Sequence, residues 1–179
     1  MPSLRIGHRL MLIVAVGIVG LIAVIAVDLT SLRSTMMEDR RAKVQDIVAA
    51  AHELAAHYHE MAESGEMSDA KAQAAAKAAI GAIRYGQSDY LWINDLQGRM
   101  VMHPIKPELI GKGLLEFEDP NGKRLFAEMV ETVKADGAGF VDYLWPKAGS
   151  DVPVQKVSFV RGFQPWGWVS GTGIYVDDV

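Results

Sequence analysis

The sequence contains no cysteine and no run rich in lysine and arginine, and both absences narrow what the protein does. Without cysteine there is neither a disulfide framework nor a thiolate metal site. The formal net charge of −4 removes the attraction that dominates nucleic-acid binding, so nucleic acid is not expected as a partner. With 179 residues, 50% of them hydrophobic, the chain suits one compact domain plus one additional element.

Motifs of the common enzyme classes are missing as well. There is no Gly-x-Ser-x-Gly, phosphate loop or nucleotide fingerprint. His52, Glu53 and His57 resemble a metalloprotease helix, but His57 lies about 140° around a helix from His52. His52 and His59 share a face but are about 10 Å apart along it, too far for one ion without other ligands. We therefore predict no catalytic residue, no metal site and no cofactor; metal analysis would test the remaining alternative, a metal-dependent enzyme.

Residues 10–27 form an uninterrupted apolar run that is long enough to cross a membrane. As a helix it would reach about 27 Å, close to the roughly 30 Å of a hydrocarbon core. Arg5 and Arg9 precede it and Asp28 follows, so the positive-inside rule places residues 1–9 in the cytoplasm. Residues 28–179 would then lie outside the inner membrane, in the periplasm of a bacterium.

A cleaved signal peptide is the competing interpretation of the same segment. The apolar core of a signal peptide is usually about 7–15 residues long and ends at a small-x-small site. This core is longer, and Ala23 and Ala26 are spaced one residue too far apart for that site. The criteria favour an uncleaved anchor.

The following pattern predicts helices first and strands later. Residues 29–62 lack Pro and Gly and repeat apolar residues every three to four positions, which predicts one long amphipathic helix. Ser68 and Asp69 begin a second, alanine-rich helix that should end near residues 85–86. Further on, Asp119 and Pro120 should open a helix that runs to about residue 135.

Short runs rich in aromatic and β-branched residues predict five strands. They are residues 90–93, 100–102, 139–145, 154–163 and 168–176. The first two flank a glycine-containing turn, and the last two flank residues 164–167, which read as a tight turn. Strands joined as hairpins make an antiparallel sheet, so the fold class is α+β.

Several motifs in residues 90–176 resemble those of the single Cache domains of bacterial chemoreceptors and sensor kinases, the group called sCache_2. They are Tyr90-Leu91-Trp92-Ile93-Asn94, Met102-His103-Pro104, Asp119-Pro120-Asn121-Gly122-Lys123, Tyr143-Leu144-Trp145-Pro146-Lys147 and Phe163-Gln164-Pro165-Trp166-Gly167-Trp168. The resemblance implies a PAS-like, five- to six-stranded antiparallel sheet behind a long N-terminal helix, with a pocket for small organic acids such as acetate, propionate, pyruvate or lactate. Family members usually continue into a second membrane helix and a signalling module, whereas this sequence ends at Val179, as a piece of a receptor or as a stand-alone anchored protein.

A pocket for a carboxylate must replace its water with aimed hydrogen-bond donors, preferably including a cation. Arg84 at the end of the second helix, His103 after the second strand and Lys156 on the fourth strand supply such donors. Alternation along the strands gathers aromatic rings on one face. By resemblance, the pocket residues are Arg84, Tyr90, Trp92, His103, Tyr143, Trp145 and Lys156. Each also has a structural interpretation, in which Arg84 complements a helix dipole and the rings form core.

We therefore expect a periplasmic sensor of small carboxylates that signals across the membrane. His103, titrating near neutral pH, would make binding pH-dependent. Lys147, at a strand end, is expected either to close the pocket or to cap a loop. Long helices of this kind often pair, which is compatible with a homodimer. The alternative is an anchored accessory module that docks on a partner protein, with a pocket filled by its own side chains and an exposed apolar patch.

Overall fold

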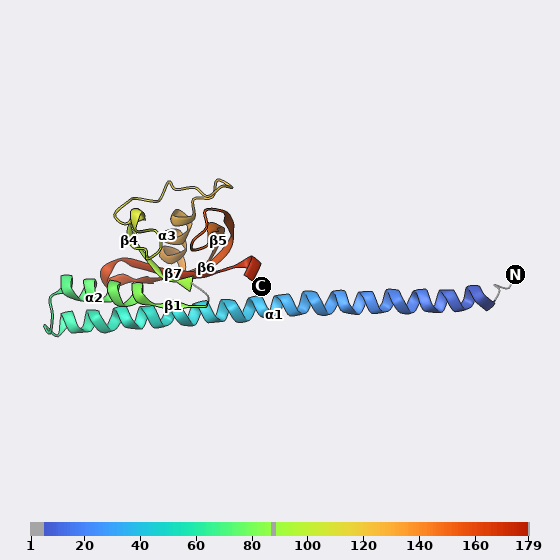
Figure 1. The fold of residues 1–179 in the computed structure, drawn as a ribbon. Coiled ribbons are helices and arrows are strands. Elements are labelled where there is room, and N and C mark those ends of the chain that lie inside the picture. Colours follow the sequence, from blue (N-terminus) through green and yellow to red (C-terminus); the bar gives the residue numbers. More distant parts are fainter. Residues whose placement is uncertain (1–5, 87–88, 179) are drawn as a thin grey trace. The chain divides into compact units, whose positions relative to one another are not determined.

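The computed structural model describes residues 6–86 and 89–178; within its first helix, the side chains of residues 6, 8–10, 12, 13, 26, 29 and 30 are outside the description. The chain divides into two compact units, residues 1–39 and residues 40–179. Helix α1, Ile6–Glu63, contributes to both units (Figure 1). The second unit holds every other element, and the candidate site lies within it.

The expected long helix is present as the second part of α1. It ends where Gly65 adopts a left-handed φ of 80°, and the backbone N–H of Ser64 donates to Glu60 O at 2.8 Å. A glycine in this conformation closes a helix because it has no Cβ to clash. Helix α2, Asp69–Ala82, follows after the turn and packs its alanine-rich face inward through Ala72, Ala76 and Ile80.

Within residues 6–86 and 89–178, none of the helices is long and apolar enough to cross a membrane. The expected anchor, residues 10–27, includes residues 10, 12, 13 and 26, whose side chains the structure does not describe. Residues 1–5 of the expected cytoplasmic segment are also outside the described residues. The membrane anchor therefore stays a prediction.

The central element is a five-stranded antiparallel sheet in the order β4-β3-β7-β6-β5. Its strands are β3 Trp92–Asp95, β4 Met100–Met102, β5 Ala138–Pro146, β6 Pro153–Phe163 and β7 Trp168–Tyr175. A separate pair joins β1, Arg84–Tyr85, to β2, Asp89–Tyr90. The predicted α+β class and antiparallel sheet are confirmed.

Each face of the sheet carries its own hydrophobic core, because successive strand residues point to opposite sides. On one side Leu91 and Ile93 pack with residues of α1 and α2, among them Val48 and Ile80. On the other side are Tyr90, Trp92, Tyr143 and Trp145, covered by helix α3, Leu125–Asp136. The predicted aromatic face therefore exists, and it is the face that α3 covers.

The second helix ends earlier than expected. Ile83 already has an extended backbone with ψ of 126°, and Arg84 belongs to β1 rather than to a helix end. Tyr85 pairs with Asp89 across the two-stranded sheet, and its hydroxyl hydrogen-bonds to Thr172 on β7. The strand pair and the long-range bond to Thr172 together outweigh the helical preference of the segment, which is a weak predictor on its own.

Helix α3 also begins later than Asp119. The carboxylate of Asp119 instead ties a loop, because its Oδ1 accepts the backbone N–H of Asn121 and Lys123 at 2.8 and 3.0 Å. Its Oδ2 accepts the N–H of Leu144 on β5 at 2.9 Å. Burial opposes ionisation of Asp119, but these backbone donors outweigh it and lower the pKa of the carboxyl. Helix α3 ends at Asp136, close to the predicted end near residue 135, and Gly137 follows in the left-handed region with φ of 77°.

Candidate functional site

A small cavity lies between the aromatic face of the sheet and the cover of α3. It is lined by Tyr90, Trp92, His103, Leu125, Phe126, Tyr143, Trp145 and Lys156. Its enclosed volume is about 10 Å³, which is room for about one water molecule. Six of the seven predicted site residues meet here, from β2, β3, β5, β6 and the residue after β4.

Arg84 is the exception, because the structure places it outside the lining of this cavity. Its side chain is exposed, and its Nη1 donates to the backbone carbonyls of Gly81 and Ile83 at 2.7 and 2.8 Å. These carbonyls end α2 and have no further helical partner, which is the structural role that a cation near a helix C-terminus commonly takes. Arg84 therefore caps a helix and does not line the cavity.

Lys156 supplies the cation of the cavity. It is 2% exposed, and its Nζ donates to the hydroxyl of Tyr175 at 3.3 Å. The same Nζ lies 4.6 Å from the ring centroid of Tyr175, 4.8 Å from that of Tyr90 and 5.4 Å from that of Trp92. Among the described residues no carboxylate comes within ion-pair distance of Lys156. Aromatic faces attract a cation, but they leave most of its hydrogen-bonding capacity unused.

The surroundings make Lys156 a titrating group near neutral pH. Burial lowers the pKa of Lys156 to about 7, because the charged ammonium loses its water. The negative charge of Asp89 acts in the opposite direction. Burial raises the pKa of Asp89 itself, and the positive charge of Lys156 partly counters that rise. An anion that enters the cavity would restore the charged form of Lys156.

His103 is a neutral donor rather than a titrating switch. Its Nδ1 accepts the backbone N–H of Ile105 and Lys106 at 3.3 and 3.0 Å, which places the remaining proton on Nε2. Burial, followed by the charges of Lys156 and Lys106, lowers the pKa of His103 to about 3. The expectation that His103 titrates near neutral pH was therefore wrong, because a buried imidazole beside two cations resists protonation.

Tyrosine and tryptophan side chains complete the polar part of the wall. The hydroxyls of Tyr143 and Ser158 are 2.8 Å apart, and the Nε1 of Trp145 donates to Tyr90 OH at 3.2 Å. The Nε1 of Trp92, although buried, has no hydrogen-bond partner. A buried donor without an acceptor is costly, so this face of the sheet can accommodate one more acceptor than the protein supplies.

Sequence reasoning missed three residues of the site. Leu125 and Phe126 begin α3 and form an apolar wall, but the sequence placed them inside a helix without indicating which face they use. Tyr175 on β7 pairs with Lys156 on β6. A register between those strands, counted back from the turn at 164–167, would have put the two side by side.

The arrangement suits a small anion with a short apolar part. The ammonium of Lys156 and the Nε2–H of His103 are donors, and Leu125 and Phe126 are the only wall residues without a polar side-chain group. Among the described residues, no group of three or more His, Cys, Asp and Glu side chains is placed so that it could hold a metal ion. Lys147 does not line the cavity; it forms ion pairs with Asp177 and Asp178.

Comparison with known proteins settles the family. The model of the Cache domain designated dCache_2 matches residues 21–179. The chain belongs to the Cache family. This confirms the resemblance to Cache domains that the motifs of residues 90–176 indicated, although the matching model is dCache_2 and the motifs had pointed to sCache_2.

The similar proteins include chemotaxis receptors, a sensor histidine kinase of Rhizobium johnstonii and solved sensor domains. The methyl-accepting chemotaxis protein McpP of Pseudomonas putida KT2440 is 38% identical over 177 residues, 99% of this chain and 32% of that protein. A solved structure described as a periplasmic sensor domain of a chemotaxis protein is 56% identical with a TM-score of 0.78, over 79% of this chain and 99% of its own. Another, described as the structural basis for carboxylic acid recognition by a Cache chemosensory domain, is 42% identical with a TM-score of 0.77, over 80% and 98%. The chain thus spans about a third of the curated relative.

Proposed function

We propose that residues 40–179 form a chemosensory domain that binds a small carboxylate in the cavity around Lys156. The observation that carries this proposal is a buried ammonium without a carboxylate partner in the described part of the chain. A lone buried charge is costly, and an anionic ligand would offset that cost. A relative with 42% identity is described in terms of carboxylic acid recognition, which supports the same class of ligand.

The proposed binding mode divides the ligand between two kinds of wall. The carboxylate accepts hydrogen bonds from Lys156 Nζ and His103 Nε2, and the carbon chain lies against Leu125 and Phe126. Charge-assisted bonds of this kind are short and strong. Because the cavity in its present form has room for only about one water molecule, we propose the smallest organic acids, those of two or three carbons such as acetate, propionate, pyruvate and lactate. Some outward movement of the side chains accompanies binding.

We further propose that residues 10–27 anchor the domain in the inner membrane, with residues 1–9 in the cytoplasm and the sensor in the periplasm. Large apolar side chains of this segment are exposed, namely Met11, Val14, Val16, Ile18, Val19, Leu21, Ile22, Val24, Ile25 and Val27. Exposed apolar surface of this extent is typical of a segment that another apolar phase covers. Pairing of two chains through α1 stays a prediction.

A second function, docking on a partner protein without a metabolite, has one observation in its favour. The cavity is largely filled by its own side chains, as that function predicts. A neighbouring open groove of about 420 Å³ contains apolar groups, among them Leu109, Phe117 and Pro153. The buried Lys156 argues against this function, because an unpaired buried cation is destabilising and nothing would offset that cost in a cavity that never holds an anion.

Calorimetry of the full chain in detergent separates the two functions. Acetate, propionate, pyruvate and lactate are titrated into the wild type and into Lys156→Met, which keeps the length of the side chain but removes its charge. We expect heat of binding from at least one acid, and a loss of affinity of about 100-fold in Lys156→Met. Arg84→Ala is the matched control, because Arg84 is a cation outside the cavity, and it should bind like the wild type.

Absence of heat with all four acids would contradict the carboxylate proposal and favour the docking function. Equal affinity in the wild type and in Lys156→Met would contradict the assignment of the site. A loss in Arg84→Ala comparable to that in Lys156→Met would restore the role that the sequence first suggested for Arg84.

A further inference from the structure

Tyr175 connects the cation of the cavity to the end of the last strand. Its hydroxyl accepts a hydrogen bond from Lys156 Nζ at 3.3 Å. The same hydroxyl donates to the backbone carbonyl of Pro146, at the end of β5, at 2.9 Å. Tyr175 is itself the last residue of β7, so one phenol connects the ligand site to the end of β5, which lies beyond β6 in the sheet.

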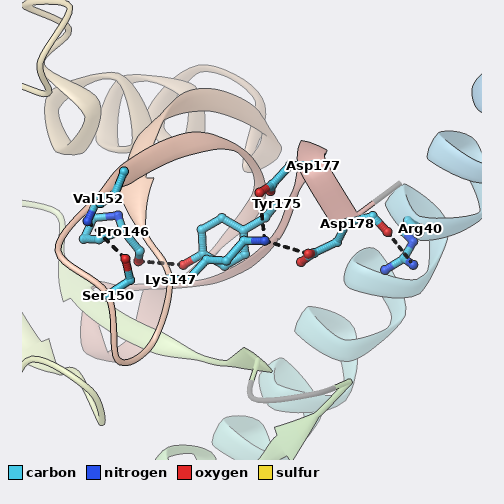
Figure 2. Close-up of polar contacts among 8 residues, drawn as sticks. All are labelled: Arg40, Pro146, Lys147, Ser150, Val152, Tyr175, Asp177 and Asp178. Atoms are coloured by element: carbon cyan, nitrogen blue, oxygen red, sulfur yellow. Dashed lines mark hydrogen bonds and ion pairs between the residues drawn. The ribbon is translucent and has the colours of Figure 1, made fainter.

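The residue after Pro146 holds the turn that follows Tyr175. Lys147 Nζ lies 2.9 Å from a carboxylate oxygen of Asp177 and 2.6 Å from one of Asp178 (Figure 2). It also lies 5.5 Å from the ring centroid of Tyr175. The short helix η3, Val176–Asp178, is thereby tied to the end of β5.

A third contact ties the same turn to the long helix. Arg40 on α1 donates from Nη2 to the backbone carbonyl of Asp178 at 3.0 Å, as Figure 2 shows. We call the four residues Arg40, Lys147, Asp177 and Asp178 the C-terminal clasp. The clasp joins α1, the end of β5 and the segment after β7, which are far apart in sequence.

The clasp is built from contacts that open easily. The side chains of Lys147, Asp177 and Asp178 are 33%, 52% and 47% exposed. Exposed ion pairs contribute little to stability on their own, because water and salt screen them. Because these contacts are weak, a small change at the buried Tyr175 can shift the equilibrium between the closed and the open clasp.

We propose that the clasp responds to occupancy of the cavity, with Tyr175 as the positioning residue that links them, so that a bound carboxylate tightens the turn 176–178 on α1. This inference rests on the proposed carboxylate site. An anion beside Lys156 favours the charged ammonium, and a charged donor holds the Tyr175 hydroxyl more firmly. A fixed Tyr175 in turn fixes Pro146, and with it the neighbouring Lys147 on the two aspartates. The ligand thereby stabilises the closed clasp.

Hydrogen exchange of the full chain in detergent tests the link. The amides of residues 176–178 are followed with and without saturating propionate, in the wild type and in Tyr175→Phe. We expect propionate to slow exchange at least threefold in the wild type and to leave it unchanged in Tyr175→Phe, at a propionate concentration that calorimetry shows to saturate each protein. Equal exchange with and without propionate in the wild type would overturn the proposal, as would the same slowing in Tyr175→Phe.

The affinity of the cavity for propionate provides the reciprocal test. If binding of propionate stabilises the closed clasp, then breaking the clasp must weaken binding of propionate. Lys147→Met removes both ion pairs at a distance from the cavity, and it should weaken propionate binding about fivefold. Lys134→Met, which removes an exposed lysine of α3, is the matched control and should leave affinity unchanged. Wild-type affinity in Lys147→Met would contradict the coupling.

A ligand-free comparison separates failure of this inference from failure of the carboxylate site. Lys156→Met removes the donor to Tyr175 without any ligand present. It should speed exchange at residues 176–178 relative to the wild type, whichever ligand the cavity takes. If no acid binds but this difference appears, the carboxylate assignment fails while the link through Tyr175 holds. If exchange is the same in both proteins, the link itself is refuted.

Discussion

At the scale of single residues, the site depends on a lysine in surroundings that disfavour its charge. Three aromatic rings and a hydroxyl surround Lys156, and the protein supplies no adjacent carboxylate within its described residues. Burial lowers the pKa of Lys156 to about 7. His103 beside it stays neutral, since burial and two lysine charges lower the pKa of His103 to about 3. Charge in the cavity is therefore controlled by Lys156 alone.

This assignment predicts how affinity depends on pH. The form that binds a carboxylate has Lys156 protonated, and the free protein loses that proton as pH rises through about 7. Affinity for propionate should therefore fall between pH 7 and pH 9, by up to about tenfold per unit, and should change little between pH 6 and pH 7. Calorimetry at pH 8 in buffers of different ionisation enthalpy should show proton uptake on binding. Affinity that rises with pH would contradict this role of Lys156.

Stability of the ligand-free protein should change in the same range with the opposite sign. Because the folded pKa of Lys156 is below its unfolded value of 10.5, the unfolded state binds more protons between about pH 7 and pH 10. The contribution of Lys156 to the free energy of unfolding therefore increases as pH rises through that window. Below about pH 7 both states are protonated, and the cost of the buried charge is constant.

At the scale of elements, the strands could be predicted from the sequence, whereas the end of α2 and the start of α3 could not. Alternation is a local pattern, so the shared face of Tyr90 and Trp92 followed directly from their spacing. The end of α2 did not, because the pairing of β1 with β2 and the bond from Tyr85 to Thr172 decide it. Arg84 was misplaced for that reason.

The start of α3 shows the same limit. Asp119 and Pro120 have the composition of a helix start, and the local pattern gives no reason to choose otherwise. In the structure, Asp119 instead bonds to Leu144 on β5, a residue that is remote in sequence. The local sequence cannot reveal whether the Asp119 carboxylate will cap a helix or bind the backbone of a distant strand.

Strand β7 supports the cavity through a glycine that leaves room for Trp92. A Cβ at Gly171 would lie 2.7 Å from Trp92 Cζ2 and 2.9 Å from Val160 Cγ1. Gly171→Ala should therefore push the indole out of place, lower the free energy of unfolding by about 1–3 kcal/mol and weaken propionate binding. Urea unfolding and calorimetry measure the two effects. Gly113→Ala is the control, since a Cβ there meets nothing within 4 Å, and an equal loss in both variants would refute the steric explanation.

At the scale of the whole molecule, the order of elements and the family could be predicted, whereas the links between distant segments could not. The motifs of residues 90–176 indicated the Cache family, and the family model confirms it. The clasp involves Arg40, Lys147 and Asp178, whose proximity depends on the complete fold. No spacing along the chain predicts it.

The proposed topology has a direct test, because the chain contains no cysteine. We expect a single cysteine introduced as Asp151→Cys, in the exposed loop after β5, to react with a membrane-impermeant maleimide in intact spheroplasts. Ser3→Cys should react only after the membrane is broken, because residues 1–9 are proposed to lie in the cytoplasm. Labelling of both variants in intact spheroplasts, or of neither, would contradict the topology.

The most direct measurement of the central claim is the pKa of Lys156 by NMR of the side-chain nitrogen, with and without saturating propionate. A carboxylate in contact with the ammonium should raise the pKa from about 7 by about one to three units, because a nearby opposite charge favours the charged form. The Lys134 signal of the same protein serves as an internal reference and should not shift. A pKa of Lys156 that is the same with and without bound propionate would show that the anion lies elsewhere.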